Sequence, residues 1–534
     1  MTQKIQNIIN SHLNISCVLE KPRDKKFGHF ALPTFSLAKE LKKSPQIIAG
    51  EFAKKLESLS EIKSISVVNG YVNFSLSDAF LSACAWEFLQ GKKAESKEKK
   101  EKILLEFVSA NPTGPLHIGH ARGAVFGDSL ARIGKYLGYE ITTEYYVNDA
   151  GAQIQNLGLS IYFAGRHLFF NEAYELPDGC YKGEYILDLA KEAKESLGQE
   201  IFKAQNAENI KKLSEFGKDK MLIEIKENLA AVGISFDNFI SEKEMFKGWD
   251  SALESLKKHN GVYLEGEKLW LKSSACGDEK DRVVVRENGE PTYLAGDIIY
   301  HKFKFERDFN RYINIWGADH HGYIARVQAA ISYLGYDSAK LEVLLSQMVA
   351  LLKDGKPYKM SKRAGNFVLM KEVVEEVGAD ALRLVFLSKK PDTHLEFDID
   401  SLKKQDSSNP VYYINYAHAR IHTLFSKSSF TLESFKKQDC EAFLDSVELS
   451  EELRDLLVLA LGIDKVISDS FNQRLVNKLV DFLRTLAAEF HRFYNETKIL
   501  NTENEEQILK VLVVVAESLA LGLDLLGIKA KVSM

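Results

Sequence analysis

The spacing of apolar residues changes several times along this chain, and each change predicts a different kind of element. Phe126, Leu130 and Ile133 recur at steps of four and three, which is the stripe of an amphipathic helix. Apolar runs at residues 103–108 and 141–147 flank this helix and are typical of buried strands. Because a strand–helix–strand order favours parallel pairing, we expect an α/β fold with a Rossmann-like parallel sheet.

Further parts are predicted around this sheet. Residues 312–316 and 343–345 are two more apolar runs of strand length. Between about residues 165 and 270, a stretch rich in Lys and Glu has mainly helical spacing, which predicts a helical insertion into the sheet domain. From about residue 401 to 534 only helical patterns occur, and their apolar faces predict an all-α bundle.

A smaller unit precedes the sheet. Helical spacing around Phe35 and Leu41, followed by alternation from Val68 to Phe74, predicts a compact α+β module. The next segment holds six lysines and three glutamates with almost nothing to bury, so we expect a solvated linker. The expected organisation is a module at 1–91, a linker at 92–102, a Rossmann-like domain at 103–345, a loop with connecting helices at 346–400 and a helical domain at 401–534.

Composition narrows the class of protein. The chain has 534 residues, too many for one core, and its 45% hydrophobic and 27% charged residues are typical of folded globular proteins. Lys and Arg number 70 against 75 for Asp and Glu, and this formal charge of −5 excludes a protein held to nucleic acid by global charge. The most apolar segment, residues 511–516, is far shorter than the roughly 20 residues that a bilayer requires.

Cellular location and metal content follow from two further features. The N-terminus lacks the apolar core of a secretory signal. The five cysteines are scattered and form no CxxC pair, so we expect neither a disulfide framework nor a structural metal site. We therefore expect a cytoplasmic protein that does not associate with a membrane.

The segment Ser-Ala-Asn-Pro-Thr-Gly-Pro-Leu-His-Ile-Gly-His at 109–120 joins the first predicted strand to the predicted helix. A helix N-terminus in that place offers free N–H groups and a positive dipole end to a phosphate. His117 and His120 are three residues apart and can share one helix face, while Gly119 between them leaves room for a purine ring. A pair of structural histidines is the alternative, but the strand–loop–helix context favours a nucleotide site.

A second segment with candidate chemistry is Lys-Met-Ser-Lys-Arg at 359–363, which follows Asp-Gly-Lys-Pro at 354–357. Gly and Pro predict a loop, and three closely spaced cations there suit a polyphosphate. Taken alone, this loop could equally be a solvated basic loop. Its combination with the histidine segment favours phosphate binding.

The two segments, in this order, resemble the signatures of class I aminoacyl-tRNA synthetases. Several further blocks resemble the arginyl-tRNA synthetase family in particular, and together they cover most of the chain. Asp-Ala-Leu-Arg at 380–383 resembles the tetrapeptide that names the family's anticodon-binding domain, although that helix could also be scaffold. The other blocks are Lys-Phe-Gly-His-Phe-Ala at 26–31, Glu-Phe-Val-Ser-Ala-Asn-Pro at 106–112, Val-Asn-Asp-Ala-Gly at 147–151 and Trp-Gly-Ala-Asp-His-His-Gly-Tyr at 316–323.

The resemblance implies an arginine–tRNA ligase: ATP activates L-arginine, and the arginyl group then passes to the terminal adenosine of tRNA(Arg). It implies ATP with accompanying Mg²⁺, no metal ligated by the protein itself, activation that requires tRNA, and a monomer. His117 and His120 are the implied catalytic residues for the phosphates, and Lys359 and Lys362 for the leaving pyrophosphate. The other implied ATP-binding residues are Asn111, Pro112, Thr113, Gly114, Gly119, Gly317, Asp319, His320, Met360 and Ser361.

Residues for arginine and tRNA are implied as well. A guanidinium group has five N–H donors and a permanent charge, so its pocket needs carboxylates. By resemblance, Glu106 and Asp297 recognise arginine, Tyr293 covers its aliphatic stem, and Ser109, Asn111 and Asp319 complete the site. Tyr71 and Asn73 of the module are the implied tRNA contacts, although Tyr71 could instead be a core aromatic residue.

Two other functions remain possible at this point. Small-molecule nucleotidyltransferases share the histidine motif and the fold, but they need neither an N-terminal module nor a helical C-terminal domain. An RNA-binding paralogue without catalysis is the second alternative, and the intact His117, His120, Lys359 and Lys362 argue against it.

Overall fold

The computed structural model describes residues 1–22, 24–91, 101–353, 355–357, 368–406, 408–438, 443 and 449–534. The chain forms two compact units, Lys99–Lys404 and a second unit that combines Met1–Glu98 with Gln405–Met534. Most of the expected linker and the whole Lys-Met-Ser-Lys segment lie outside the described residues.

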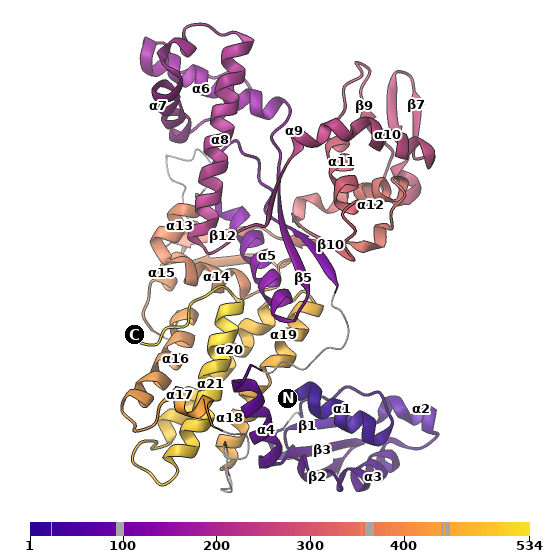
Figure 1. Cartoon of the computed structure of the whole chain (residues 1–534), viewed down its shortest axis with the longest axis vertical. Helices are drawn as coiled ribbons and strands as arrows, with labels where there is room; N and C mark the ends of the chain where they lie inside the picture. Colours follow the sequence, from indigo (N-terminus) through magenta and orange to yellow (C-terminus); the bar gives the residue numbers. More distant parts are fainter. Residues whose placement is uncertain are drawn as a thin grey trace. The chain divides into compact units, whose positions relative to one another are not determined.

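The unit Lys99–Lys404 is built on a parallel sheet whose described strands have the order β11-β10-β4-β5-β6. Four of these strands are the ones that the apolar pattern predicts, so the parallel α/β fold is confirmed (Figure 1). The fifth, β6, has only four half-buried residues, so no apolar run in the sequence predicts it. The strands are β4 (Lys102–Glu106), β5 (Glu140–Val147), β6 (Asn238–Ser241), β10 (Arg311–Gly317) and β11 (Leu341–Ser346).

Helices connect the strands of this sheet and pack against it. The predicted amphipathic helix is α5 (Ile118–Tyr136), which connects β4 to β5. Helix α11 (Tyr293–Phe305) precedes β10, and α12 (Ile324–Tyr333) follows it. One part of the core is formed by Leu104, Phe305, Tyr312, Val327, Ile331 and Leu341.

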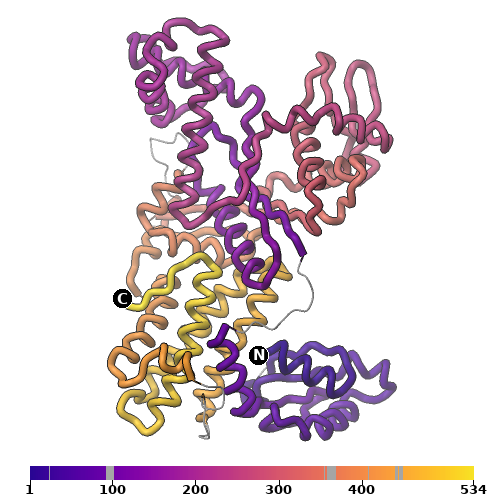
Figure 2. Tube along the Cα trace, in the orientation of Figure 1, coloured from indigo at the N-terminus to yellow at the C-terminus, as the bar shows by residue number. Residues whose placement is uncertain are grey.

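The stretch expected as a helical insertion is only partly helical. Helices α6 (Ala152–Phe170), α7 (Glu184–Leu197) and α8 (Ala207–Ala231) pack around their own apolar cluster, and Figure 2 shows the chain leave β5 through α6 and return through α8. The stretch then contains β6 of the main sheet. After α9 (Glu242–Met245) and α10 (Trp249–Lys258), the chain forms a small antiparallel sheet, β7 (Val262–Glu265), β8 (Lys268–Leu271) and β9 (Arg282–Val285).

The segment after β11 is not only loop and helix. Strands β12 (Val349–Lys353), β13 (Lys356–Pro357) and β14 (Leu395–Asp398) form another small sheet beside α13 (Met370–Val377), α14 (Ala379–Leu387) and α15 (Ile399–Leu402). Arg383 on α14 is fully buried and donates to Asp128 Oδ2 at 2.5 Å and to the Val232 carbonyl at 2.8 Å. The Asp-Ala-Leu-Arg block therefore serves as scaffold in this unit.

The other unit begins with an α+β module. Its described strands, β1 (Phe30–Pro33), β2 (Ile62–Val68) and β3 (Tyr71–Leu76), pair antiparallel in the order β1-β3-β2. Helices α1 (Thr2–Leu13), α3 (Pro45–Leu56) and α4 (Asp78–Leu89) accompany them. The helical pattern near Phe35 gives only a 3₁₀ turn, Phe35–Leu37, and the single-turn α2 (Ala38–Leu41), because Lys42 adopts a left-handed conformation directly afterwards.

The described residues after Gln405 form helices only, as the pattern predicts. The most apolar segment of the sequence lies fully buried in α21, at the centre of this bundle. None of the helices in the described ranges is long and apolar enough to span a membrane. The helices are α16 (Pro410–Ser426), α17 (Leu432–Lys436), α18 (Glu451–Leu461), α19 (Ile463–Asn472), α20 (Asn477–Glu496) and α21 (Glu505–Leu525).

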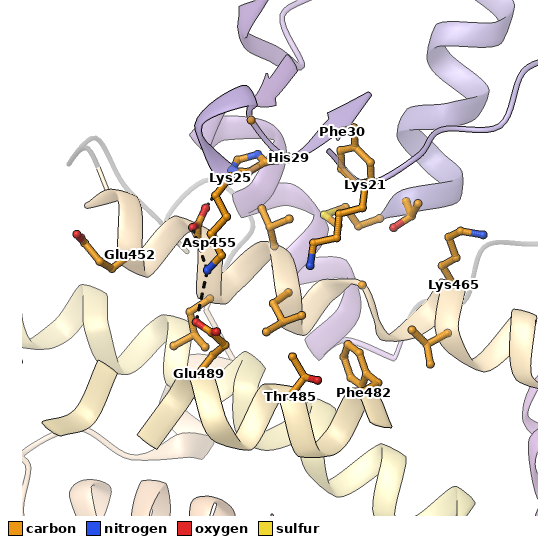
Figure 3. A pocket seen from close by; sticks show the side chains of 18 of the residues that line it. Lys21, Lys25, His29, Phe30, Glu452, Asp455, Lys465, Phe482, Thr485 and Glu489 are labelled. Carbon is orange, nitrogen blue, oxygen red and sulfur yellow. Dashed lines mark ion pairs between the residues drawn. The ribbon is translucent and has the colours of Figure 1, made fainter. Parts of the chain in front are cut away.

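Ion pairs join the module to this bundle. Arg454 on α18 donates to both carboxylate oxygens of Asp78, at 2.7 and 3.0 Å. At a cavity of about 360 Å³ lined by α18, α19, α20 and the start of the chain, Lys25 lies between Asp455 at 3.8 Å and Glu489 at 3.5 Å (Figure 3). The module and the bundle are thus one unit.

Candidate active site

The loop after β4 begins with two strained residues. Val108 has a φ of +69° and Ser109 a φ of +44°, in the left-handed region that residues other than glycine rarely adopt. Each such residue costs on the order of 1–3 kcal/mol, and the cost is tolerated mainly where function requires the geometry. The turn places Ser109 Oγ so that it donates to Glu106 Oε1 at 2.9 Å and accepts from the Tyr146 N–H at 3.1 Å.

His117 and His120 lie together at the N-terminus of α5. His117 is the N-cap, and its Nδ1 accepts from the Gly119 N–H at 3.1 Å. The two imidazole rings stack with centroids 3.6 Å apart. Burial lowers the pKa of both, that of His120 to about 3 with a further contribution from His117, so both rings are neutral near pH 7. His120 Nδ1 is buried without a hydrogen-bond partner among the described residues.

Gly119 also makes room within the protein. A Cβ at this position would lie 2.9 Å from Cε1 of His117. The missing side chain thus makes room for the His117 ring itself, which could not otherwise cap the helix and stack on His120.

The histidine motif is hydrogen-bonded through its backbone to Val368 and Met370. Val368 and Met370 follow the Lys-Met-Ser-Lys segment at the next described positions. The Val368 carbonyl accepts from Ile118 N–H at 2.9 Å, and Met370 N–H donates to the Leu116 carbonyl at 2.9 Å. The described chain at Val368 and Met370 is therefore fixed directly against the histidine motif.

The other expected nucleotide residues follow β4 and β10. These strands are parallel neighbours, so their following loops open at the same edge of the sheet, where α/β folds bind ligands. Thr113 is buried, and its carbonyl accepts from Tyr185 OH at 3.2 Å, while Asn111 is exposed. Gly317 ends β10, and Asp319 and His320 extend into solvent on the 3₁₀ turn that follows.

A half-buried carboxylate, Asp297, and a buried one, Glu242, lie close together near the start of α11. Asp297 Oδ2 accepts from Tyr323 OH at 2.6 Å. Glu242, which directly follows β6, lies so close that a Cβ on Gly296 would collide with its Oε1, and its Oε2 is buried with no partner among the described residues. Burial raises the pKa of Asp297 to about 6 and that of Glu242 to about 7, and nearby carboxylates add to both shifts.

Glu242 was not found by sequence reasoning. It stands in a polar stretch, Ser-Glu-Lys-Glu, and no local pattern distinguishes it from its neighbours. Only the pairing of β6 with β5 brings it beside Asp297.

Two more of the predicted arginine residues have different surroundings. Glu106 is buried, and its second carboxylate oxygen is engaged by Lys304. Tyr293 is 61% exposed, and its ring lies 3.9 Å from the place where Gly151 would carry a Cβ. A tyrosine in that position can move over a bound ligand.

The predicted tRNA residues lie on β3 of the other unit. Tyr71 is half-buried and meets the ring of Phe35 edge-on at 5.0 Å, and Phe35 is itself 49% exposed. Asn73 is only 4% exposed because β3 runs between β1 and β2. The structure thus offers an aromatic surface at Tyr71 and keeps Asn73 inside.

A parallel sheet with His-Ile-Gly-His at its first strand–helix junction is typical of class I aminoacyl-tRNA synthetases, and the comparison with protein families identifies this class. The family model "tRNA synthetases class I (R), catalytic domain" matches residues 86–422. The models "Arginyl tRNA synthetase N terminal domain" and "DALR anticodon binding domain" match residues 1–76 and 414–534.

Individual proteins agree with these models. The arginine–tRNA ligases of Wolinella succinogenes and Campylobacter jejuni are 58% and 52% identical to this chain, each over the full length of both chains. A crystal structure from C. jejuni, described as an arginyl-tRNA synthetase, is 53% identical, with a TM-score of 0.81 over 86% of this chain and 100% of that one. The Thermus thermophilus arginyl-tRNA synthetase shares the fold over the whole length of both chains, with a TM-score of 0.77 at 23% identity. The chain belongs to the arginyl-tRNA synthetase family.

Proposed function

We propose that this ligase forms arginyl-adenylate at the carboxyl ends of β4 and β10 and then transfers arginine to the terminal adenosine of tRNA(Arg). The observation that best supports this site is the backbone connection between Val368–Met370 and the histidine motif. It supports a site in which the residues just after the second signature segment lie at the histidine motif. The match of all three domain models to this chain leaves a small-molecule nucleotidyltransferase without support.

The histidines stabilise charge on the phosphates. The arginine carboxylate attacks the α-phosphate of ATP, and pyrophosphate leaves; such chemistry needs positioning and charge neutralisation more than a covalent intermediate. Neutral His117 and His120 donate hydrogen bonds beside the N-terminus of α5, whose dipole adds to their effect. Lys359 and Lys362 hold the pyrophosphate, and Mg²⁺ enters with ATP. The remaining ATP contacts are Asn111, Pro112, Thr113, Gly114, Gly119, Gly317, Asp319, His320, Met360 and Ser361.

The guanidinium group lies between Asp297 and Glu242. Two carboxylates whose charges are disfavoured by burial become favourable partners for a permanent cation. Tyr293 closes over the aliphatic stem, while Ser109, Asn111 and Asp319 hold the amino and carboxylate ends. Glu106 lies behind the site, where it accepts a hydrogen bond from Ser109 Oγ.

Aromatic surfaces of the other unit bind tRNA. Tyr71 with Phe35 offers a stacking surface for an unpaired base, and Asn73 supports the strand from within. In the DALR anticodon binding domain, Arg420 lies between the rings of Tyr416 and Tyr494, at 4.7 and 4.2 Å. We assign this cluster to the anticodon loop, because stacked aromatic and guanidinium planes hold unpaired bases.

A charging assay with each of the twenty amino acids on total tRNA tests the function directly. We expect arginine alone to be charged, and pyrophosphate exchange to need tRNA in addition to arginine and ATP. Pyrophosphate exchange with another amino acid, or none with any, would contradict the proposal. We further propose that the protein is cytoplasmic, since ATP and tRNA are abundant there. We also propose that it is a monomer, and light scattering with and without tRNA tests this.

A further inference from the structure

A row of buried polar side chains crosses the main sheet. In the register of the parallel strands, Asn314 on β10 lies opposite Glu106 on β4, and Glu106 lies opposite Glu144 on β5. All three side chains are buried. Two cations from the end of α11 and the residues after it neutralise the carboxylates, Lys304 at Glu106 and Arg307 at Glu144.

Lys304 is enclosed completely. Its exposure is 0%, and its ammonium donates to Glu106 Oε2 and, at 2.8 Å, to Asn314 Oδ1. It also lies 4.3 Å from the centre of the Tyr300 ring. A buried ammonium is stable only where such partners replace water, so this cation is tied to its position.

The contacts of Lys304 lead to both sides of the arginine site. Through Glu106 they reach Ser109, whose hydroxyl occupies Glu106 Oε1 and is fixed by the Tyr146 N–H. Through Asn314 they reach His301, whose ring contacts Asn314 Nδ2 at 3.2 Å and the Asp297 carbonyl at 2.8 Å. One ammonium therefore connects the strained turn after β4 to the first turn of α11.

We propose that Lys304 is a positioning residue of the arginine site: it fixes Glu106 as the support of Ser109, and it leaves Asp297 and Glu242 as the carboxylates that meet the guanidinium. Glu106 has internal donors on both oxygens, whereas Glu242 Oε2 has none among the described residues. The charge of Glu106 is already balanced by Lys304, so the guanidinium is balanced by the other two acids. This inference rests on the proposed arginine site.

A double-mutant cycle tests the assignment. Lys304→Met and Glu106→Gln each leave one buried charge unpaired, and we expect each to raise the arginine KM by about tenfold or more, with the ATP KM nearly unchanged. The double variant removes both charges together, and its arginine KM should return to within about threefold of the wild-type value. Lys304→Arg keeps the cation and should stay close to wild type.

The arginine KM of the double variant, compared with that of Glu106→Gln, decides between the two roles of Glu106. If Glu106 contacts the guanidinium itself, the double variant will bind arginine no better than Glu106→Gln, and the proposal is overturned. This comparison does not need Lys304→Met to fold, because the double variant carries no unpaired buried charge at this pair. Asp297→Asn distinguishes a failure of the proposed arginine site from a failure of the proposed role of Lys304. An unchanged arginine KM in this variant would reject the arginine site as a whole. A raised arginine KM, together with additive effects in the Lys304–Glu106 cycle, would reject the role of Lys304 alone.

The pH profile of arginine kcat/KM gives a readout that a scaffold residue would not move. The groups around Asp297 are Tyr146, Glu242, Tyr323, Glu106, His320 and Lys304. Loss of the Lys304 cation makes the acids harder to ionise, so the acid limb should shift to higher pH in Lys304→Met and return in Lys304→Arg. Arg307→Met is the matched control, since it breaks the neighbouring buried pair with Glu144. This variant should have a lower melting temperature, but the acid limb of its pH profile should stay where it is in the wild-type protein.

Discussion

The imidazole rings of His117 and His120 stack with their planes only 27° apart, and the ring of the first residue also caps the helix that carries the second. His120 is thus fixed by packing, with a buried Nδ1 that lacks a partner among the described residues. Its pKa near 3 keeps the ring neutral throughout the useful pH range, so it acts as a hydrogen-bond donor and carries no charge of its own.

We expect His120→Ala to slow adenylate formation by about 10²–10³-fold, the typical cost of losing one transition-state donor. ATP affinity should change little, because the interaction strengthens only as charge develops on the α-phosphate. Single-turnover kinetics, combined with a direct measurement of ATP Kd, checks this. A normal rate of the chemical step would remove His120 from the catalytic residues.

Asp297→Asn and Glu242→Gln should each raise the arginine KM while the ATP KM stays near its wild-type value. A charge-assisted bond to guanidinium is worth ~1.5–3 kcal/mol against ~1 for a neutral one, which corresponds to roughly a tenfold change. Steady-state kinetics with each substrate varied in turn gives the answer. Equal losses for both substrates would make these acids scaffold residues.

The same two acids predict how stability depends on pH. Both have folded-state pKa values, about 6 and about 7, above the ordinary values of 3.8 and 4.5, because burial disfavours their charge. Their contribution to stability is therefore fully present at low pH and is lost as the pH rises through 6 to 7. Bound arginine restores this contribution to stability, because its guanidinium group pairs with the two ionised acids. The arginine-induced rise in melting temperature should therefore be larger at pH 8 than at pH 5.5. Asp297→Asn should reduce the difference between the two pH values. A rise in melting temperature that is the same at both pH values in the wild-type protein would contradict the prediction.

Val108→Gly should separate stability from function. Glycine adopts the φ of +69° without strain, which offsets the greater freedom of its unfolded chain, so we expect stability within about 1 kcal/mol of wild type. Arginine kcat/KM should fall, because glycine also allows other conformations of this turn, and Ser109 Oγ is then held less firmly between Glu106 and Tyr146. Asn501→Gly, at a left-handed residue of the other unit, is the control and should leave the kinetics unchanged.

Tyr71→Ala and Phe35→Ala should weaken tRNA binding, with little loss of stability at the exposed Phe35. Asn73→Ala should instead lower the melting temperature, because its side chain is enclosed by the neighbouring strands. Filter binding of tRNA(Arg) together with thermal melts distinguishes these effects. A destabilised Tyr71→Ala variant with an unaltered tRNA Kd would show that Tyr71 belongs to the core.

The sequence by itself determined the main elements of the sheet domain and pointed to candidate residues for phosphate binding. Strands β4, β5, β10 and β11 and helix α5 follow from apolar runs and a helical stripe, since burial of one face leaves a local period in the chain. His117 and His120 were recognisable because a helix N-terminus after a buried strand is itself a local pattern. The fold class followed from these signals, and the family followed from the resemblance of its sequence blocks.

The tertiary structure decided which charged groups meet. Glu242 lies beside Asp297 only because β6 pairs with β5, and Lys304 engages Glu106 only because α11 packs over the strands at that register. The chain contains 75 acidic and 70 basic residues, and nothing in their local spacing says which of them will share a buried site. Partner choice among like residues depends on strand register and helix packing, and these exist only once the distant parts of the chain have come together.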